Sequence, residues 1–287
     1  DSQKKGFMLF THKKIRDHFD LILTAAERIS LHASIARKIF ERTDKESDSL
    51  YYDLTFHYSE ARDHANIINY AFIAGLIAKS NYAYELAVNY FNQVIRSIEE
   101  NRSFAEDAVL MKKWISCNEE IGGICLTIGE IEKGIDLYRI ILQYKNTPIE
   151  KAAIYRQICM AYFKIGNWTM SEEYGRKGLQ LLGESLPIGR FAVLAGIVRG
   201  LIRHSAHVAA PYLFLRMRTS RNNESERMKI WLYVSTNWMY ILSDVAKFTN
   251  AIIRMLNISE SRIGKSRELA MSLSAFASML MAAPKFS

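Results

Sequence analysis

The sequence predicts an all-α fold built from antiparallel helical hairpins. Glycine (14) and proline (4) are scarce among the 287 residues, whereas all-β proteins need many turns that these two residues form. The composition is 49% hydrophobic and 24% charged, which is typical of a globular chain rather than a disordered one. Apolar residues recur at helical spacing in stretches of about 12–18 residues, and short polar breaks separate them. Short connections of this kind join helices that run antiparallel.

The N-terminal part predicts a strand followed by connecting helices. Residues 7–11, Phe-Met-Leu-Phe-Thr, form a short apolar and aromatic run typical of a strand. A single strand is not stable alone, so we expect residues 1–20 to end a small domain that lies upstream. The chain begins without Met and stops inside a helical pattern, and we interpret it as a fragment of a longer protein. Residues 21–66 are predicted to be connecting helices, with two short amphipathic helices within 21–39.

Three segments align as internal repeats within residues 67–190. The match is clearest over 152–182, where Gly166-Asn167-Trp168 forms the turn between two helices. Segments 115–142 and 68–95 match the same repeat pattern less well. In each repeat a small residue on the first helix faces a small residue on the second, which permits close packing. In the two later repeats a turn glycine, Gly129 or Gly166, ends the first helix in a left-handed conformation. The facing pairs are Gly75 with Ala87, Gly122 with Gly134, and Cys159 with Ser171.

This order of a small residue, a Gly-x-aromatic turn and a second small residue resembles the tetratricopeptide repeat (TPR). The resemblance implies a right-handed superhelix of stacked hairpins. Gly122 follows Gly75 by 47 residues and Cys159 follows Gly122 by 37, while the family repeat is about 34 residues long. We therefore expect extended helices and irregular stacking. Residues 191–287 are predicted to form further irregular hairpins, from helical patterns at Met228–Leu256 and Arg267–Met281.

A second likeness covers residues 7–95 and one short segment further along the chain. It rests on Phe7–His12 with Ile15-Arg16, on Leu54–Asp63, on Tyr82–Tyr90 and on Leu182–Pro187. This series is similar to the region after the ATPase module in STAND-type signalling proteins, such as MalT-like regulators and ATPase-linked adenylyl cyclases or kinases. These proteins combine an AAA-like ATPase, a winged helix and a TPR-like region. The resemblance implies a β-wing remnant at the N-terminus and a regulatory arm that senses a partner or ligand.

The first helix of each hairpin would line the inner face of such a stack. Aromatic, Met and Arg anchors beside charges suit a peptide or helix partner. We therefore predict a non-catalytic scaffold that binds a protein or peptide, or other domains of the same chain. The alternatives are a small-ligand sensor with a pocket between hairpins and a basic surface that contacts nucleic acid. The predicted inner-face residues are Phe72, Leu76, Lys79, Glu119, Leu126, Arg156, Met160, Phe163 and Lys164.

The net charge is +8, and the whole excess lies in residues 198–287, which hold 13 basic and 5 acidic residues. A basic region can meet an acidic partner, a nucleic acid or an anionic surface. A solvated loop and helix face is the plainer interpretation, and no aromatic residues alternate with the charges as a stacking platform requires. The predicted basic patch consists of Arg216, Arg218, Arg221, Arg227 and Lys229.

No motif predicts catalysis, a metal site or a cofactor. Gly264-Lys265-Ser266 is part of a phosphate-binding loop pattern, but the first glycine of that pattern is Ser259 here. His204 and His207 lack a third ligand nearby, so we interpret them as two surface histidines. The longest apolar run, residues 191–202, is broken by Arg199 and is too short to span a membrane. Three cysteines, an odd number, predict buried free thiols in a reducing, cytoplasmic compartment.

Overall fold

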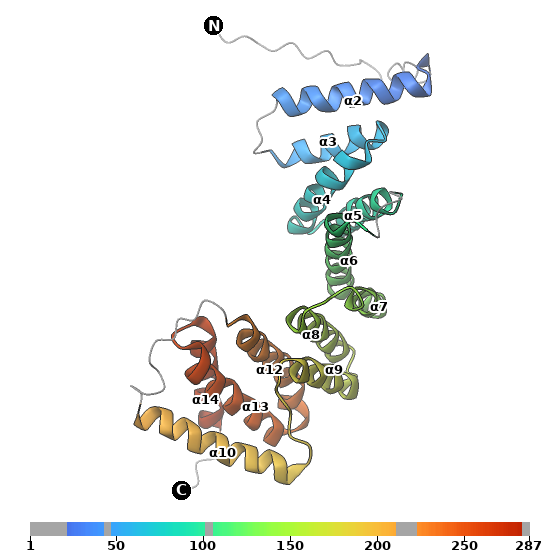
Figure 1. The fold of residues 1–287 in the computed structure, drawn as a ribbon. Coiled ribbons are helices and arrows are strands. Elements are labelled where there is room, and N and C mark those ends of the chain that lie inside the picture. The colour runs from blue at the N-terminus through green and yellow to red at the C-terminus, as the bar shows by residue number, and fades with distance from the viewer. Residues whose placement is uncertain (1–21, 43–46, 101–105, 211–222, 283–287) are drawn as a thin grey trace. The chain divides into compact units, whose positions relative to one another are not determined.

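The computed structural model describes residues 22–42, 47–100, 106–210 and 223–282. Within these ranges the chain forms twelve α-helices and one short π-helix, with no strand, which confirms the all-α prediction (Figure 1). The predicted strand and β-wing remnant in residues 1–20 lie outside the described residues. The chain divides into two compact units, residues 1–124 and 125–287. None of the described helices is both long enough and apolar enough to cross a membrane.

The first unit is a series of helices in which α2 packs on α3, α3 on α4 and α4 on α5. Its helices are α2 (Ala25–Arg42), α3 (Asp48–Glu60), α4 (His64–Ser80), α5 (Tyr84–Glu99) and the first part of α6 (Ala108–Ile128). The prediction of two short helices within 21–39 is wrong, because α2 is one helix of 18 residues. The Thr24 hydroxyl accepts from the Glu27 amide at its start, and Ser30 is a single polar residue that leaves the helical backbone intact.

Two turns of this unit place residues other than glycine in the left-handed region. Arg62 has φ 54° between α3 and α4, and Tyr82 has φ 61° between α4 and α5. The Ala83 amide donates to the Ala78 carbonyl at 2.9 Å, which satisfies the end of α4. Tyr82 thus occupies the position that glycine occupies in a later hairpin. In the same hairpin Gly75 leaves room for the ring of Phe91, since a Cβ at Gly75 would come within 2.7 Å of it.

The second unit contains the hairpin that the sequence predicted most clearly. Its helices are the end of α6, α7 (Ile131–Leu142), α8 (Pro148–Lys164), α9 (Trp168–Leu181), α10 (Arg190–Ala209), α12 (Glu224–Ser243), α13 (Val245–Ile258), the π-helix η1 (Ser259–Ile263) and α14 (Arg267–Ala282). Gly166 has φ 72° between α8 and α9, as predicted. The Ser171 hydroxyl donates to the Cys159 carbonyl at 3.0 Å, which confirms the facing small residues in this repeat. Thr147 and Glu150 form a capping box at the start of α8.

The C-terminal helices depart from simple consecutive hairpins. The stretch Met228–Leu256, expected to belong to a further hairpin, lies in two helices that pack on each other, α12 and α13. Asp244 ends α12, and its carboxylate accepts from the Lys247 amide at 3.0 Å. α10 packs against α13, which is far from it in the sequence (Figure 1). A large apolar cluster joins residues of α8, α9, α12, α13 and η1, with Tyr233 and Tyr240 among its buried side chains. This cluster holds the second unit together.

Candidate functional site

Four of the predicted inner-face residues lie on α8. Arg156, Met160 and Lys164 follow one another at intervals of four residues and therefore share one face of the helix. Arg156 and Met160 are half-buried, whereas Lys164 is exposed. Phe163 instead packs against the large apolar cluster of the unit, so its ring serves the core. The α8 face, which we define as Arg156, Met160 and Lys164, alternates a cation, a flexible apolar side chain and a second cation.

Lys164 links α8 to the end of α6. Its Nζ donates to the carbonyl oxygen of Leu126 at 2.8 Å. An ammonium group has three N–H donors, so this bond leaves donors for a partner. The side chain of Leu126 is only 7% exposed, and at this face α6 therefore contributes its backbone carbonyl rather than the predicted apolar side chain.

Arg156 is a half-buried cation that forms no ion pair with an acidic group of the described residues. Burial lowers the pKa of its guanidinium, and the neighbouring Tyr138 and Cys159 oppose that effect. No carboxylate of the described residues forms an ion pair with Arg156. Burying a charge is costly unless it is paired or hydrogen-bonded, so this position favours an anionic group supplied from outside.

In the first unit, α4 carries Phe72 and Leu76 of the predicted inner face. The Phe72 ring lies 5.8 Å from the Phe91 ring, between centroids. The Nζ of Lys113 lies 4.1 Å from the Phe72 centroid, which is a cation–π contact. Leu76 is 38% exposed. Phe72 is therefore mainly a packing residue, and Leu76 is the apolar side chain that α4 presents to solvent.

The charged inner-face residues of the first unit are already engaged. Lys79 of α4 forms an ion pair with Glu120 of α6, with 2.5 Å between Nζ and Oε2. Glu119, which precedes Glu120 in the sequence, is half-buried and also interacts with other groups of the protein. A partner at this position would compete with an existing ion pair, which distinguishes Lys79 from Arg156.

The predicted basic patch lies only partly within the described residues. Arg227 Nη1 lies 3.3 Å from Glu268 Oε1. Lys229 is 5% exposed, and its Nζ lies 2.9 Å from Glu226 Oε1. Both residues pair with carboxylates, of α14 and α12 respectively. The prediction of a solvated basic surface is wrong for the buried Lys229, whereas Arg227 is exposed. Arg216, Arg218 and Arg221 lie outside the described residues.

The interpretation of His204 and His207 as surface histidines is also wrong. His207 is 1% exposed, and its Nδ1 lies 2.6 Å from Glu260 Oε2. His204 Nδ1 lies 2.9 Å from the other oxygen of the same carboxylate. Glu260 belongs to η1, far along the sequence, and packing of α10 on α13 brings it to the histidines. In the described ranges no group of three or more His, Cys, Asp or Glu residues could hold a metal ion.

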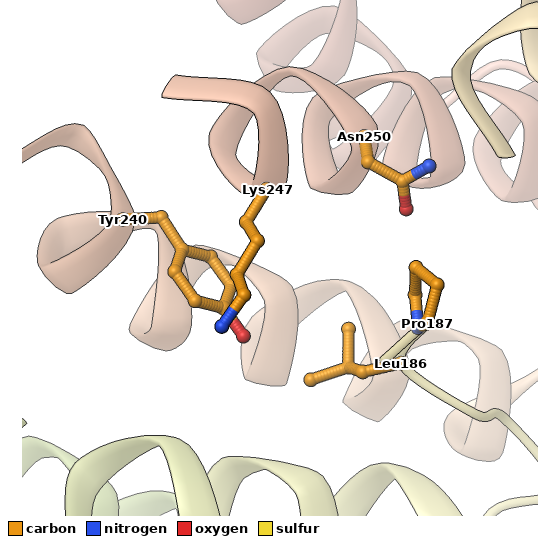
Figure 2. A pocket seen from close by; sticks show the side chains of 5 residues that line it. All are labelled: Leu186, Pro187, Tyr240, Lys247 and Asn250. Carbon is orange, nitrogen blue, oxygen red and sulfur yellow. The ribbon is translucent and has the colours of Figure 1, made fainter. Parts of the chain in front are cut away.

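A small void lies where α12, α13 and the loop after α9 meet (Figure 2). Its volume is about 10 Å³, the lower limit for a single water. Beside it, Lys247 Nζ donates to both oxygens of Glu172, at 2.8 and 3.0 Å, and the Tyr240 hydroxyl donates to Oε1 at 3.1 Å. Burial, reinforced by Glu172, raises the pKa of Tyr240. We interpret this network as a structural tie between α9, α12 and α13. The lining residues are Leu186, Pro187, Tyr240, Lys247 and Asn250.

The three cysteines are buried free thiols, as predicted. Burial raises the pKa of Cys117 to about 12 and that of Cys159 to about 11. Because the thiolate is the reactive form, neither side chain is activated as a nucleophile at neutral pH. Gly264-Lys265-Ser266 is a helix start: Gly264 has φ 76°, and the Ser266 hydroxyl accepts from the Leu269 amide at 3.2 Å.

Sequence reasoning missed the residues that α10 and α13 bring together. Glu260 is one of them, and Arg199, Arg203 and Arg254 at a pocket between the two helices are others. The spacing of Arg199 and Arg203 places them on one helix face, but nothing in the sequence indicates which helix lies opposite. A scan against protein-family models and a search of curated proteins found no match to this chain.

Proposed function

We propose that this chain is a non-catalytic scaffold that binds a protein or peptide partner, and that it is the regulatory part of a larger cytoplasmic signalling protein. Two helical hairpins, α4–α5 and α8–α9, support the scaffold because their packing follows the repeat pattern. Stacking of such hairpins into a right-handed superhelix is part of the proposal. The link to a STAND-type ATPase rests on the sequence resemblance.

The observation that carries the proposal is the unpaired, half-buried Arg156 on the α8 face. A partner carboxylate would restore the charge compensation that burial removes. Eight residues separate Arg156 from Lys164, which corresponds to about 12 Å along the helix. An extended peptide spans that distance in about four residues. The face therefore fits a segment with two acidic residues about four positions apart and an apolar residue between them, opposite Met160.

Charge reversal of the α8 face tests the proposal. The variant Arg156→Glu with Lys164→Glu should lose both the partner captured from lysate of the source organism and the binding of peptides with the acidic spacing described above. Fluorescence anisotropy measures the peptides, and mass spectrometry identifies the captured protein. Circular dichroism should remain that of a folded helical protein, since both side chains reach the surface.

A matched control reverses one arginine and one lysine elsewhere in the same unit. Arg190 and Lys265 are exposed, so Arg190→Glu with Lys265→Glu changes the net charge equally. Loss of binding in the α8 variant alone supports the proposal. Equal loss in both variants would show unspecific attraction of charge, and unchanged binding in both would show that the α8 face is not the contact surface.

A further inference from the structure

A pocket of about 190 Å³ lies between α10 and α13, beside the loop that follows α9. Three arginines line it, Arg199 and Arg203 from α10 and Arg254 from α13. Glu184 of the loop and Asn257 of α13 provide further polar groups. The volume is that of about six water molecules, given roughly 30 Å³ for each in the liquid. Drug-sized ligands occupy larger pockets, of about 300 Å³ or more, so a ligand here would be small.

Two glycines bring the helices close enough to form this pocket. A Cβ at Gly196 would overlap the Asn250 amide, and one at Gly200 would overlap Ile253. These glycines are four residues apart, so they share the face of α10 that contacts α13. Arg199 and Arg203 have the same spacing and follow each glycine by three residues. The packing therefore places the backbone of both arginines at the edge of the helix interface, and their side chains line the pocket.

The described lining residues do not balance the positive charge of the pocket. Glu184 is engaged by Arg254, with 3.1 Å between Nη1 and Oε2, and it also accepts from the Tyr233 hydroxyl at 3.2 Å. Arg203 Nη2 donates a long hydrogen bond, 3.4 Å, to the Ser261 hydroxyl. Within the described part of the chain Arg199 has no hydrogen bond or ion pair. Three arginines and one carboxylate leave a formal charge of +2 on the lining.

The other acidic group near this end of α10 does not offset that charge. Glu260 binds His204 and His207 through both of its oxygens. Like charges at an interval of four residues on a helix repel each other. Arg199 and Arg203 thus form an unfavourable pair at the mouth of a polar cavity, and a bound anion would relieve the repulsion.

We propose that this pocket binds the phosphate group of a small molecule. A phosphate monoester carries a charge of about −1.5 to −2 at neutral pH, which matches the +2 of the lining. Its oxygens accept several charge-assisted hydrogen bonds, and the planar guanidinium donates such bonds in pairs. Arg254 is already oriented by Glu184 and by the Ser185 carbonyl, at 3.0 Å from Nη1, so the ligand would recruit mainly Arg199 and Arg203.

This site is independent of the α8 face, because none of its lining residues belongs to α8. Binding is measured on the full 287-residue chain by isothermal titration calorimetry. The probes are inorganic phosphate, glycerol phosphate and acetate, each at the same ionic strength. We expect both phosphate probes to bind and acetate to show no binding. The stronger phosphate probe then identifies the source, a free phosphate or a phosphorylated small molecule.

The variant Arg199→Gln with Arg203→Gln should weaken phosphate binding at least about tenfold, since two charge-assisted hydrogen-bonding groups are lost. Both arginines are exposed, so the thermal unfolding midpoint without phosphate should change little. The control Arg190→Gln with Arg267→Gln removes the same charge outside the pocket and should bind as the native chain does. Absence of phosphate binding, equal binding of acetate, or equal weakening in both variants would overturn the proposal.

Discussion

Replacement of Gly175 by alanine tests how α9 packs against α12. A Cβ at Gly175 would overlap the γ-methyl of Thr236, which is fully buried. Alanine gains about 0.5–1 kcal/mol over glycine inside a helix. Overpacking of a dense core costs about 1–3 kcal/mol, and Thr236 cannot move aside easily because a β-branched side chain is stiff. We therefore expect Gly175→Ala to lower the free energy of unfolding by about 1–2 kcal/mol.

A double-mutant cycle combines Gly175→Ala with Thr236→Ser. The serine removes the obstructing methyl but keeps the hydroxyl that donates to the Tyr233 carbonyl at 3.0 Å. Alone it should cost about 1 kcal/mol for the lost buried methyl. In the double variant the new Cβ fills the vacated space. The loss of stability in the double variant should therefore be smaller than the sum of the two single losses by about 1 kcal/mol or more. Urea unfolding followed by far-ultraviolet circular dichroism measures all four proteins.

Gly178→Ala provides the matched control. Its Cβ would lie 2.7 Å from Leu232 Cδ2, which is the end of a side chain that can rotate, so the loss should be smaller than for Gly175→Ala. A Gly175→Ala variant as stable as the native chain, or a double variant that loses the full sum of the single losses, would refute overpacking at Thr236.

Three further predictions concern turns, caps and thiols. Tyr82→Gly should raise the free energy of unfolding by about 0.5–1 kcal/mol, because it relieves a left-handed backbone at an exposed position. Tyr84→Gly at the start of α5 should lower the free energy of unfolding. A less stable Tyr82→Gly variant and a more stable Tyr84→Gly variant would contradict the left-handed conformation of Tyr82. Thr147→Ala should cost about 1 kcal/mol at neutral pH in urea unfolding. The hydrogen bonds of Thr147 lower the pKa of Glu150 from its ordinary 4.5, so their stabilisation is present above that value and is lost as the pH falls through the lower folded-state pKa. The difference between native and variant chains should therefore shrink below about pH 4, whereas a constant difference would exclude the capping box as its source. Cys159, whose pKa burial raises to about 11, should react with a disulfide reagent at pH 8 only after denaturant is added, and rapid reaction of all thiols in the native chain would contradict its burial.

The candidate binding face could be read from the sequence only in part. The spacing of Arg156, Met160 and Lys164 on one helix face follows from helical periodicity alone. Their burial does not, because it depends on which neighbouring helices cover α8. Phe163 points into the core for this reason, while Arg156 lies between core and solvent without an acidic partner.

The sequence located most helix ends because those signals are local. Glycine adopts the left-handed conformation at Gly129 and Gly166, the turns of the two later repeats. Thr147 caps its own helix through a residue three positions away. The break at Asp244 was missed because one polar residue inside a helical pattern is a weak signal, and its capping bond becomes apparent only when both helices are formed.

The sequence by itself determined the helical class, the main turns and the close packing of Cys159 on Ser171, since each depends on residues near one another in the chain. Only the tertiary structure decided that α10 lies on α13, that His204 and His207 share the carboxylate of Glu260, and that the arginines of both helices surround one pocket. These groups are more than 50 residues apart in the sequence. Periodicity identifies which face of a helix is apolar, but it does not identify the helix that covers that face.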